Sequence, residues 1–260
     1  MDPSKLESKL TPNTKAIVVV HMYGGPARIR QIVEFAQKHG LYVVEDAAPA
    51  IGAEYEGKRA GTFGQFGCYS FQGAKLLVTG EGGMLVTDDD DLYEKALRIA
   101  DQGRNPSKVF WIDEHGVKFK MSNIQAALGL AQIQRADTNI AMKRRIFQWY
   151  QDRLSDSSVI TMNKEIKNAK SIYWMSSIRL LDKSPVNRDE LIQILKLKNI
   201  DTRPVFPAIS QYPIWEIKQQ AQPNASYIGQ TSLNLPSGVA LSKAQVDYVC
   251  DVILGAVKVG

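Results

Sequence analysis

Two apolar runs separated by an amphipathic stretch constrain how the first part of this chain can fold. Residues 16–20 (AIVVV) and 42–46 (YVVED) are short and continuous in apolar side chains, which is typical of buried parallel strands. Between them, apolar residues recur at helical spacing from Pro26 to about His39, and Gly40 is suited to end a helix. The pattern predicts a β–α–β unit and therefore an α/β fold.

A single lysine, Lys75, lies in a glycine-bearing segment between two β-rich runs. The segment Ser70–Gly83 reads SFQGAKLLVTGEGG and is flanked by FGCYSF and GMLVTD. Glycines allow close backbone approach and positive φ angles, so such a loop can wrap around a flat or phosphorylated ligand. The ordinary alternative is a solvated loop lysine.

An acidic residue, Asp46, ends the run YVVED, 29 residues before Lys75. Because the carboxyl ends of parallel strands meet at one edge of a sheet, the acid and the lysine can converge on one crevice. This pairing suits pyridoxal phosphate, which a lysine binds as a Schiff base while an acid contacts the pyridine nitrogen. The alternative for Asp46 is to cap a helix that follows AAPA.

The rest of the chain predicts further helices and a mixed C-terminal part. The acidic run Asp88–Asp91 predicts a helix start in preference to a metal site, and residues 102–120 lack periodicity, which predicts a long loop. A helical stretch runs from about Ser122 to Leu154, with a break near 137–139. Beyond it we expect a strand at 171–181, a helix at 187–199, a strand at 200–206, an irregular stretch around Pro207, Pro213 and Pro223, and a last helix from about Lys243.

Composition narrows the classes of function. The net charge of +5 comes from interspersed residues, and no Lys/Arg run resembles a nucleic-acid-binding arm. Three scattered histidines show no metal-ligand spacing. Cys68 and Cys250 are expected to be reduced, because they lie far apart in the sequence and the first belongs to an expected buried strand. No apolar run reaches membrane-spanning length and no signal sequence follows Met1, so the expected location is the cytoplasm.

Five segments, in order, resemble the DegT/DnrJ/EryC1/StrS family of pyridoxal-phosphate-dependent nucleotide-sugar aminotransferases. They are HMYGGPA, VVEDAAPAIGA, GTFGQFGCYSFQGAK, TGEGGMLVTDD and KMSNIQAALGLAQ. WIDEHG, YWMSSI, DTRPVF and NLPSGVALS are similar to its GDP-perosamine synthase branch. The resemblance implies fold type I. The expected domains are a large cofactor domain with an incomplete, mainly parallel sheet at 1–140 and a small α+β domain at 141–260.

The resemblance also implies roles for individual residues. Lys75 would carry pyridoxal 5'-phosphate and move protons, and Asp46 would contact the pyridine nitrogen. Ser70 would donate to the cofactor phosphate. Asn123 would reach the phosphate of a neighbouring subunit, which implies a homodimer with shared active sites; the alternative is an N-cap for the following helix.

Four further residues are substrate-binding candidates, two of them in the matched segment HMYG. His21 and Tyr23 lie at an expected strand end, where α/β proteins bind ligands; a satisfied strand-end histidine is the alternative. His115 and Arg203 belong to segments that face the sugar nucleotide in the resembling branch, and a surface salt bridge is the alternative for Arg203.

The implied reaction moves an amino group, with glutamate as expected donor, to a 4-keto-6-deoxy sugar nucleotide by a ping-pong route. Such amino sugars serve polysaccharides such as O-antigen.

Two departures from the family pattern favour a different class of function. Pro49 replaces a Gln or His that bonds near the cofactor ring, and proline has no donor. The family's large domain begins about a hundred residues earlier, and that part holds the cofactor phosphate and a ring-stacking side chain. A non-catalytic remnant, or one part of a split enzyme, is therefore the alternative. The related sugar 3-dehydratases have histidine in place of the lysine, so Lys75 argues against that branch.

Overall fold

The computed structural model describes residues 1–215 and 223–258 and divides the chain into two compact units. The first comprises Met1–Ile140 and Glu165–Trp174, and the second comprises Ala141–Lys164 and Met175–Gly260. The division falls inside one helix, α4 (Ala136–Leu154). The segment Glu165–Trp174 belongs to the first unit through long-range contacts, which no local sequence pattern predicts.

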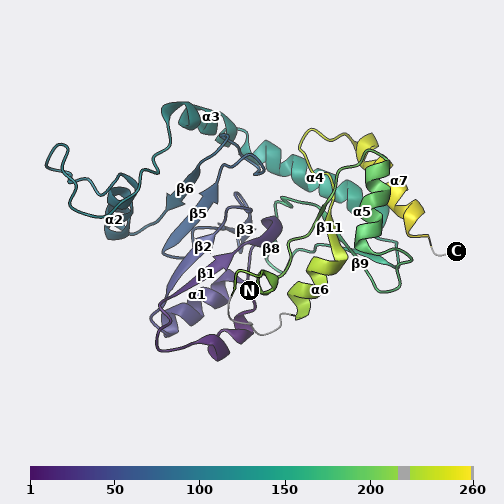
Figure 1. The fold of residues 1–260 in the computed structure, drawn as a ribbon, viewed down its shortest axis with the longest axis horizontal. Helices are drawn as coiled ribbons and strands as arrows, with labels where there is room; N and C mark the ends of the chain where they lie inside the picture. Colours follow the sequence, from purple (N-terminus) through teal and green to yellow (C-terminus); the bar gives the residue numbers. More distant parts are fainter. Residues whose placement is uncertain (216–222, 259–260) are drawn as a thin grey trace. The chain divides into compact units, whose positions relative to one another are not determined.

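A four-stranded sheet forms the centre of the first unit (Figure 1). The strands β1 (Ala16–Val20), β2 (Tyr42–Asp46) and β5 (Phe66–Ser70) are parallel, and β6 (Gly83–Val86) joins β5 antiparallel. With α1 (Ile29–Lys38) between β1 and β2, the expected β–α–β unit and α/β class are confirmed.

The first helix begins three residues later than expected. Pro26 precedes α1 because residues 22–24 form the 3₁₀ turn η3 (Met22–Gly24), and the N–H of Ala27 is bound by His21 Nδ1 at 3.0 Å. The helix end is as expected: His39 caps α1, and Gly40 follows with φ of 63°.

The remaining elements of the first unit surround this sheet. Asp89 caps α2 (Asp90–Ala100) by accepting the N–H of Leu92, so the acidic run does start a helix. No helix or longer strand is formed over 102–120, which confirms the loop. The helical stretch breaks at 134–135, between α3 (Asn123–Ile133) and α4, a few residues before the expected position. The small elements are η1 (Pro3–Lys5), η2 (Glu7–Lys9) and a sheet of β4 (Lys58–Arg59), β3 (Glu54–Tyr55) and β8 (Ala169–Lys170).

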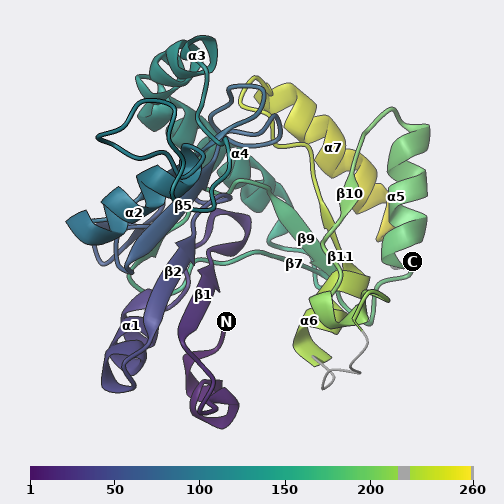
Figure 2. The same ribbon diagram turned by 60° about the vertical axis from the view of Figure 1, so that its left-hand side comes forward.

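The second unit is an antiparallel sheet with helices packed on it (Figure 2). Its strand order is β10 (Arg203–Pro204), β11 (Ser232–Asn234), β9 (Ser177–Leu180) and β7 (Ile160–Met162). Its further elements are α5 (Arg188–Leu197), η4 (Ile209–Gln211), α6 (Pro223–Thr231) and α7 (Lys243–Ala256). One core joins the sheet, α5, α7 and the second half of α4.

Three expectations for the second unit need correction. The strand expected at 171–181 is formed only over β9, because residues 171–174 turn back to the first unit. The strand expected at 200–206 pairs over two residues only. The stretch expected to be irregular contains α6 and β11. Pairing of β11 with β9 and β10 explains why residues 232–234 form a strand. Residues 216–222 of that stretch lie outside the described part.

Two observations bear on the class of protein. Among the described residues, no helix combines the length and the apolar character needed to cross a membrane. Cys68 and Cys250 are both free thiols, as expected from their separation.

A buried lysine in the second unit leads to a testable stability prediction. Lys143 is 9% exposed, its Nζ donates to the carbonyl of Ser237 at 2.6 Å, and burial lowers its pKa to about 8. The unfolded chain therefore keeps a proton between pH 8 and 10.5 that the folded chain has released. Folded-state stability should thus rise with pH in this window.

We expect Lys143→Met to remove this pH dependence. From pH 7 to pH 10, the free energy of unfolding of the wild type should rise relative to that of the variant by about 1–3 kcal/mol, since one pKa unit corresponds to about 1.4 kcal/mol. Chemical denaturation of both full-length chains at several pH values measures this. A difference that does not vary with pH would contradict the prediction.

Candidate active site

The carboxyl ends of the parallel strands bring three of the expected site residues to one edge of the sheet. Val20, the last residue of β1, is paired with Asp46 of β2, and His21 follows directly. Asp46 is paired with Cys68 of β5, two residues before Ser70. Ser70 in turn lies opposite Gly83, where β6 begins, so the segment with Lys75 leaves and re-enters the sheet at this edge.

Lys75 lies within this segment and is half-buried. Burial lowers the pKa of its amine, and the negative charge of Asp46 partly offsets this effect. In the described part of the chain, no acceptor lies within hydrogen-bond distance of the Lys75 amine; its Nζ lies 4.4 Å from the ring centroid of Trp174 instead. The solvated-lysine interpretation does not fit a side chain in these surroundings.

The backbone on either side of Lys75 is closed into a defined loop. The N–H of Phe71 donates to the carbonyl of Gly82 at 2.9 Å, and the N–H of Thr79 donates to the carbonyl of Phe71 at 2.9 Å. Thr79 is buried, and its hydroxyl donates to the carbonyl of Glu81 at 2.8 Å. The lysine is therefore presented by a loop with internal hydrogen bonds.

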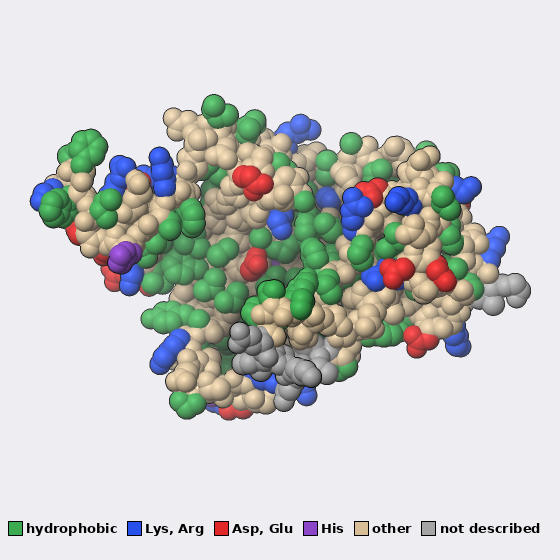
Figure 3. Space-filling model, in the orientation of Figure 1, with side chains coloured by type: hydrophobic (Ala, Val, Ile, Leu, Met, Phe, Trp, Pro, Cys, Tyr) green, Lys and Arg blue, Asp and Glu red, His purple; other side chains and the backbone are tan. Residues whose placement is uncertain are grey.

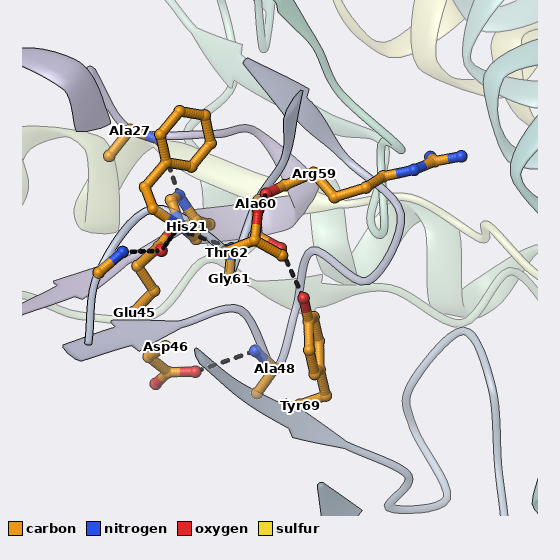
Figure 4. Close-up of polar contacts among 12 residues, drawn as sticks. His21, Ala27, Glu45, Asp46, Ala48, Arg59, Ala60, Gly61, Thr62 and Tyr69 are labelled. Carbon is orange, nitrogen blue, oxygen red and sulfur yellow. Dashed lines mark hydrogen bonds and ion pairs between the residues drawn. The ribbon is translucent and has the colours of Figure 1, made fainter. Parts of the chain in front are cut away.

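Asp46 does not cap a helix, because no helix follows it (Figure 4). Its Oδ1 accepts the N–H of Ala48 at 3.0 Å, and residues 47–50 form a turn in which the N–H of Ala50 donates to the carbonyl of Ala47. Pro49 is buried within this turn. The carboxylate is thus oriented by its own loop, and no other donor to it is recorded among the described residues.

A buried carboxylate next to Asp46 was not singled out from the sequence. Glu45 is fully buried and accepts four hydrogen bonds (Figure 4). His21 Nε2 and the N–H of Gly61 donate to Oε2 at 2.9 and 2.8 Å, and the N–H groups of Phe63 and Gly64 donate to Oε1 at 2.6 and 2.8 Å. Because side chains alternate along a strand, Glu45 and Asp46 leave opposite faces of β2. The bonds to Glu45 therefore fix the strand end that carries Asp46.

The glycines of GTFGQFG make this network possible. A Cβ at Gly67 would lie 1.8 Å from the carbonyl oxygen of Gly61, so only glycine permits the 61–64 loop to lie this close to β5. The hydroxyl of Tyr69 adds a bond to the carbonyl of Ala60 at 2.8 Å (Figure 4). The motif thus serves to hold three backbone donors on Glu45.

His21 has a structural position. It has no exposed surface, its Nδ1 accepts the N–H of Ala27, and its Nε2 donates to Glu45. Both ring nitrogens are occupied, so the geometry supports the alternative of a bonded structural histidine over substrate binding. Tyr23 is half-buried, with its ring centroid 6.2 Å from that of Trp174, and lies on the lysine side of the site.

Asn123 is the first residue of α3, and Ser122 is its N-cap. The Ser122 hydroxyl accepts the N–H of Gln125, whose side chain bonds back to Ser122, forming a capping box. The N-cap interpretation of Asn123 is therefore wrong, and its exposed side chain is free of that role. Gln125 also donates to the carbonyl of Glu81 at 2.9 Å, which holds the start of α3 against the lysine loop.

The two remaining candidates have exposed side chains. His115 is exposed in the 102–120 loop of the first unit. Arg203 belongs to the second unit, where its exposed guanidinium pairs with Asp201 at 2.5 Å, as the salt-bridge alternative has it. Trp174, by contrast, adjoins Lys75 and was not singled out. The quoted segment YWMSSI contained it, but the sequence carries no sign of which partner it meets.

Comparison with known proteins identifies the family. Residues 1–254 match the model of the DegT/DnrJ/EryC1/StrS aminotransferase family. The chain belongs to this family. The chain is 43% identical over 253 residues to a GDP-perosamine synthase of Escherichia coli O157:H7, and 38% identical over 251 residues to one of Caulobacter vibrioides. These alignments cover 97% and 96% of this chain and 68% of each relative.

Solved structures confirm the fold. An aminotransferase TlmJ from Streptoalloteichus hindustanus superposes with a TM-score of 0.91 at 27% identity, over 98% of this chain and 69% of that one. DesV of S. venezuelae superposes with a TM-score of 0.92 at 28% identity, over the whole of this chain and 70% of that one. The fold class expected from the sequence, and the pyridoxal-phosphate-dependent aminotransferase family, are therefore confirmed.

The residues at the strand ends fit pyridoxal phosphate, the cofactor of this family. A partly desolvated amine without a hydrogen-bond acceptor suits an aldehyde, and a nearby carboxylate with an oxygen left over suits the pyridine nitrogen. The Ser70 hydroxyl accepts the N–H of Gln72 at 3.3 Å, which leaves its own proton available to a phosphate. When bound, the cofactor supplies an electron sink for carbanion chemistry.

Proposed function

We propose that this chain is an aminotransferase that acts on a nucleotide-linked 4-keto-6-deoxy sugar. The observation that carries the proposal is the arrangement of Lys75 and Asp46 at the carboxyl edge of the sheet, within a chain 43% identical to a GDP-perosamine synthase. Across two half-reactions, the amino group of the donor replaces the ketone oxygen of the sugar, and the donor becomes a 2-oxoacid. With glutamate as donor, 2-oxoglutarate leaves before the keto sugar is aminated, which is a ping-pong scheme.

Each residue of the site has a defined task in this scheme. Lys75 Nζ takes the proton from the Cα of the donor and returns a proton in the second half-reaction. Burial favours the neutral amine that this task needs. With the cofactor bound, Asp46 would hold the proton on the pyridine nitrogen and Ser70 would donate to the phosphate. Tyr23 borders the lysine side of the site, where the sugar would enter.

An isotope-transfer assay tests the proposed reaction. The full chain would be incubated with pyridoxal phosphate, ¹⁵N-glutamate and a GDP-linked 4-keto-6-deoxyhexose, and the products analysed by mass spectrometry. We expect a ¹⁵N-labelled amino sugar nucleotide and an equal amount of 2-oxoglutarate. A folded chain that binds the cofactor at Lys75 but transfers no ¹⁵N to GDP- or dTDP-linked keto sugars would contradict the proposal.

The second candidate is a chain that does not catalyse alone but associates with a partner. The observation in its favour is Pro49, which is buried in the turn after Asp46 and offers no hydrogen-bond donor at a position where the family pattern has Gln or His. In that case the folded chain would neither bind the cofactor nor transfer nitrogen until a segment with the phosphate-binding turn is added.

The surface of α3 supports a homodimer with shared sites. The helix sequence NIQAALGLAQI is mostly apolar, yet none of its residues is buried, and Ile124, Leu128 and Leu130 are 77%, 52% and 63% exposed. Hydrophobic side chains are also exposed on α2 and β6 (Figure 3). Extended exposed apolar patches mark interaction surfaces. A second copy placed there would meet Asn123 at the start of α3.

Mixed dimers test the shared site. We expect Asn123→Ala to weaken cofactor binding at the neighbouring subunit's site and to leave the binding at its own site intact. A dimer of one Asn123→Ala chain and one Lys75→Ala chain would then differ from a dimer with both changes in one chain. Cofactor titration of both dimers, followed by absorbance, measures this. Equal loss in the two arrangements would contradict the shared site.

A further inference from the structure

Trp174 makes two different contacts with the segment that carries the reactive lysine. Its indole Nε1 donates to the carbonyl of Ala74 at 2.8 Å, and Lys75 Nζ lies 4.4 Å from the ring centroid. The first contact fixes the peptide immediately before the lysine. The second places the ammonium over the ring face, where the negative quadrupole of the indole attracts a cation.

The position of Trp174 is itself fixed by the turn that follows β1. The N–H of Ile172 and the hydroxyl of Ser171 both donate to the carbonyl of Gly24, at 2.9 and 3.0 Å. Gly24 has φ of 87°, and a Cβ there would lie 2.7 Å from the backbone nitrogen of Trp174. The backbone of 171–174 therefore packs against the turn only because residue 24 is glycine.

The ring of Trp174 is held as firmly as its backbone. The side chain is 6% exposed, and Tyr23 lies beside it with 6.2 Å between ring centroids and an interplanar angle of 37°. A buried aromatic ring with a bonded N–H has little freedom to leave its site. It can therefore act as a fixed support for a flexible lysine, whose four-carbon chain otherwise samples many rotamers.

We propose that Trp174 is a positioning residue for Lys75, through the Ala74 carbonyl and through the face of its indole ring. The inference rests on Lys75 being the reactive lysine of the proposed function. The indole ring and the negative charge of Asp46 both favour the protonated amine of Lys75. Burial favours the neutral amine. Among the described residues, Asp46 is the charged group recorded as acting on this amine. Trp174 thus directs the amine and moderates its basicity.

Two variants separate the two contacts. Trp174→Phe keeps an aromatic face but loses the bond to Ala74, and Trp174→Leu loses both. The lysine is followed in the cofactor-free full chain by competitive labelling with acetic anhydride between pH 6 and 11, with peptide mass spectrometry. Lys58, whose Nζ lies 5.1 Å from the Phe63 ring centroid, is the internal reference. Hydrogen exchange of the 72–77 peptide reports on the loop.

The expected results follow from the contacts. Exchange of the 72–77 peptide should rise in both variants. The pKa of Lys75 should fall by about 0.4–1.5 units in Trp174→Leu, because a cation–π contact is worth about 0.5–2 kcal/mol, and by less in Trp174→Phe. A raised or unchanged pKa in the Leu variant would overturn the role of the ring. If the Leu variant does not fold, unchanged loop exchange in Trp174→Phe overturns the proposal.

These readouts are independent of catalysis. Labelling and exchange need neither cofactor nor substrate, so a chain that fails to transfer an amino group can still show or refute the positioning of Lys75. Conversely, the enzyme could be active while Trp174→Leu leaves the Lys75 labelling profile and the exchange of the 72–77 peptide unchanged. That result would support the proposed function and contradict the positioning role of Trp174.

Discussion

Replacing Glu45 by Ala should lower the free energy of unfolding of the chain by about 3–5 kcal/mol. The carboxylate is fully buried and receives hydrogen bonds from His21 and from the N–H groups of Gly61, Phe63 and Gly64. Its removal leaves four donors without an acceptor in a place that water does not reach, and each such donor is costly. Chemical denaturation of wild type and variant measures the loss.

An exposed carboxylate of the same unit provides the control. Glu34 lies on the solvent side of α1, so Glu34→Ala should change the free energy of unfolding by no more than about 0.5 kcal/mol. A second comparison is Glu45→Gln, which keeps the shape but places an amide NH₂ among donors. We expect it to be destabilised almost as much as Glu45→Ala. A loss below about 1 kcal/mol in Glu45→Ala would show that the network is not needed for stability.

The contribution of Glu45 should also depend on pH. Burial pushes its pKa up, but the bond from His21 and those from the backbone outweigh it and hold the pKa below the ordinary value of 4.5. A lowered folded-state pKa means that the stabilisation is present above pH 4.5 and is lost as the pH falls through the folded value. The difference between wild type and Glu45→Ala should therefore shrink below pH 4.5.

Damage to this network should reach the cofactor site through the backbone. Asp46 is the next residue of β2, and its carboxylate is held by the turn that begins there. We expect a folded population of Glu45→Gln to bind pyridoxal phosphate more weakly than wild type.

Replacing Lys75 by Ala should abolish covalent attachment of the cofactor and lower the rate of amino transfer by at least about 10²–10⁴-fold, the range that general acid–base catalysis supplies. The negative charge of Asp46 acts on the Lys75 amine, which places this lysine beside the expected partner of the pyridine nitrogen. Borohydride reduction of the cofactor-loaded chain followed by peptide mapping measures the attachment, and the isotope-transfer assay measures the rate.

The control is another lysine whose amine lies over an aromatic ring. Lys58 also lies over an aromatic ring but is exposed and belongs to β4 of the small sheet. Lys58→Ala should keep the visible absorbance of the bound cofactor and the labelled peptide. If the absorbance and the reduced label survive in Lys75→Ala, another lysine is the attachment point.

Much of the first unit could be predicted because its signals are local. The apolar runs at 16–20 and 42–46 become β1 and β2, and Asp89 caps α2, since these depend on residues a few positions apart. The ordered motifs identified the family, which the comparisons confirm. Boundaries were less certain where a distant contact intervened, as at the start of α1, where His21 binds the N–H of Ala27.

By itself the sequence determined the α/β class, the family and the candidacy of Lys75 and Asp46, because strand periodicity and motif order are properties of the chain alone. Only the tertiary structure decided that Glu45 is the acceptor of four buried hydrogen bonds and that Trp174 adjoins the lysine loop. Trp174 and Ala74 are 100 residues apart in the sequence. Their meeting depends on the close approach of 171–174 to Gly24, a steric fit between distant backbones that no local pattern encodes.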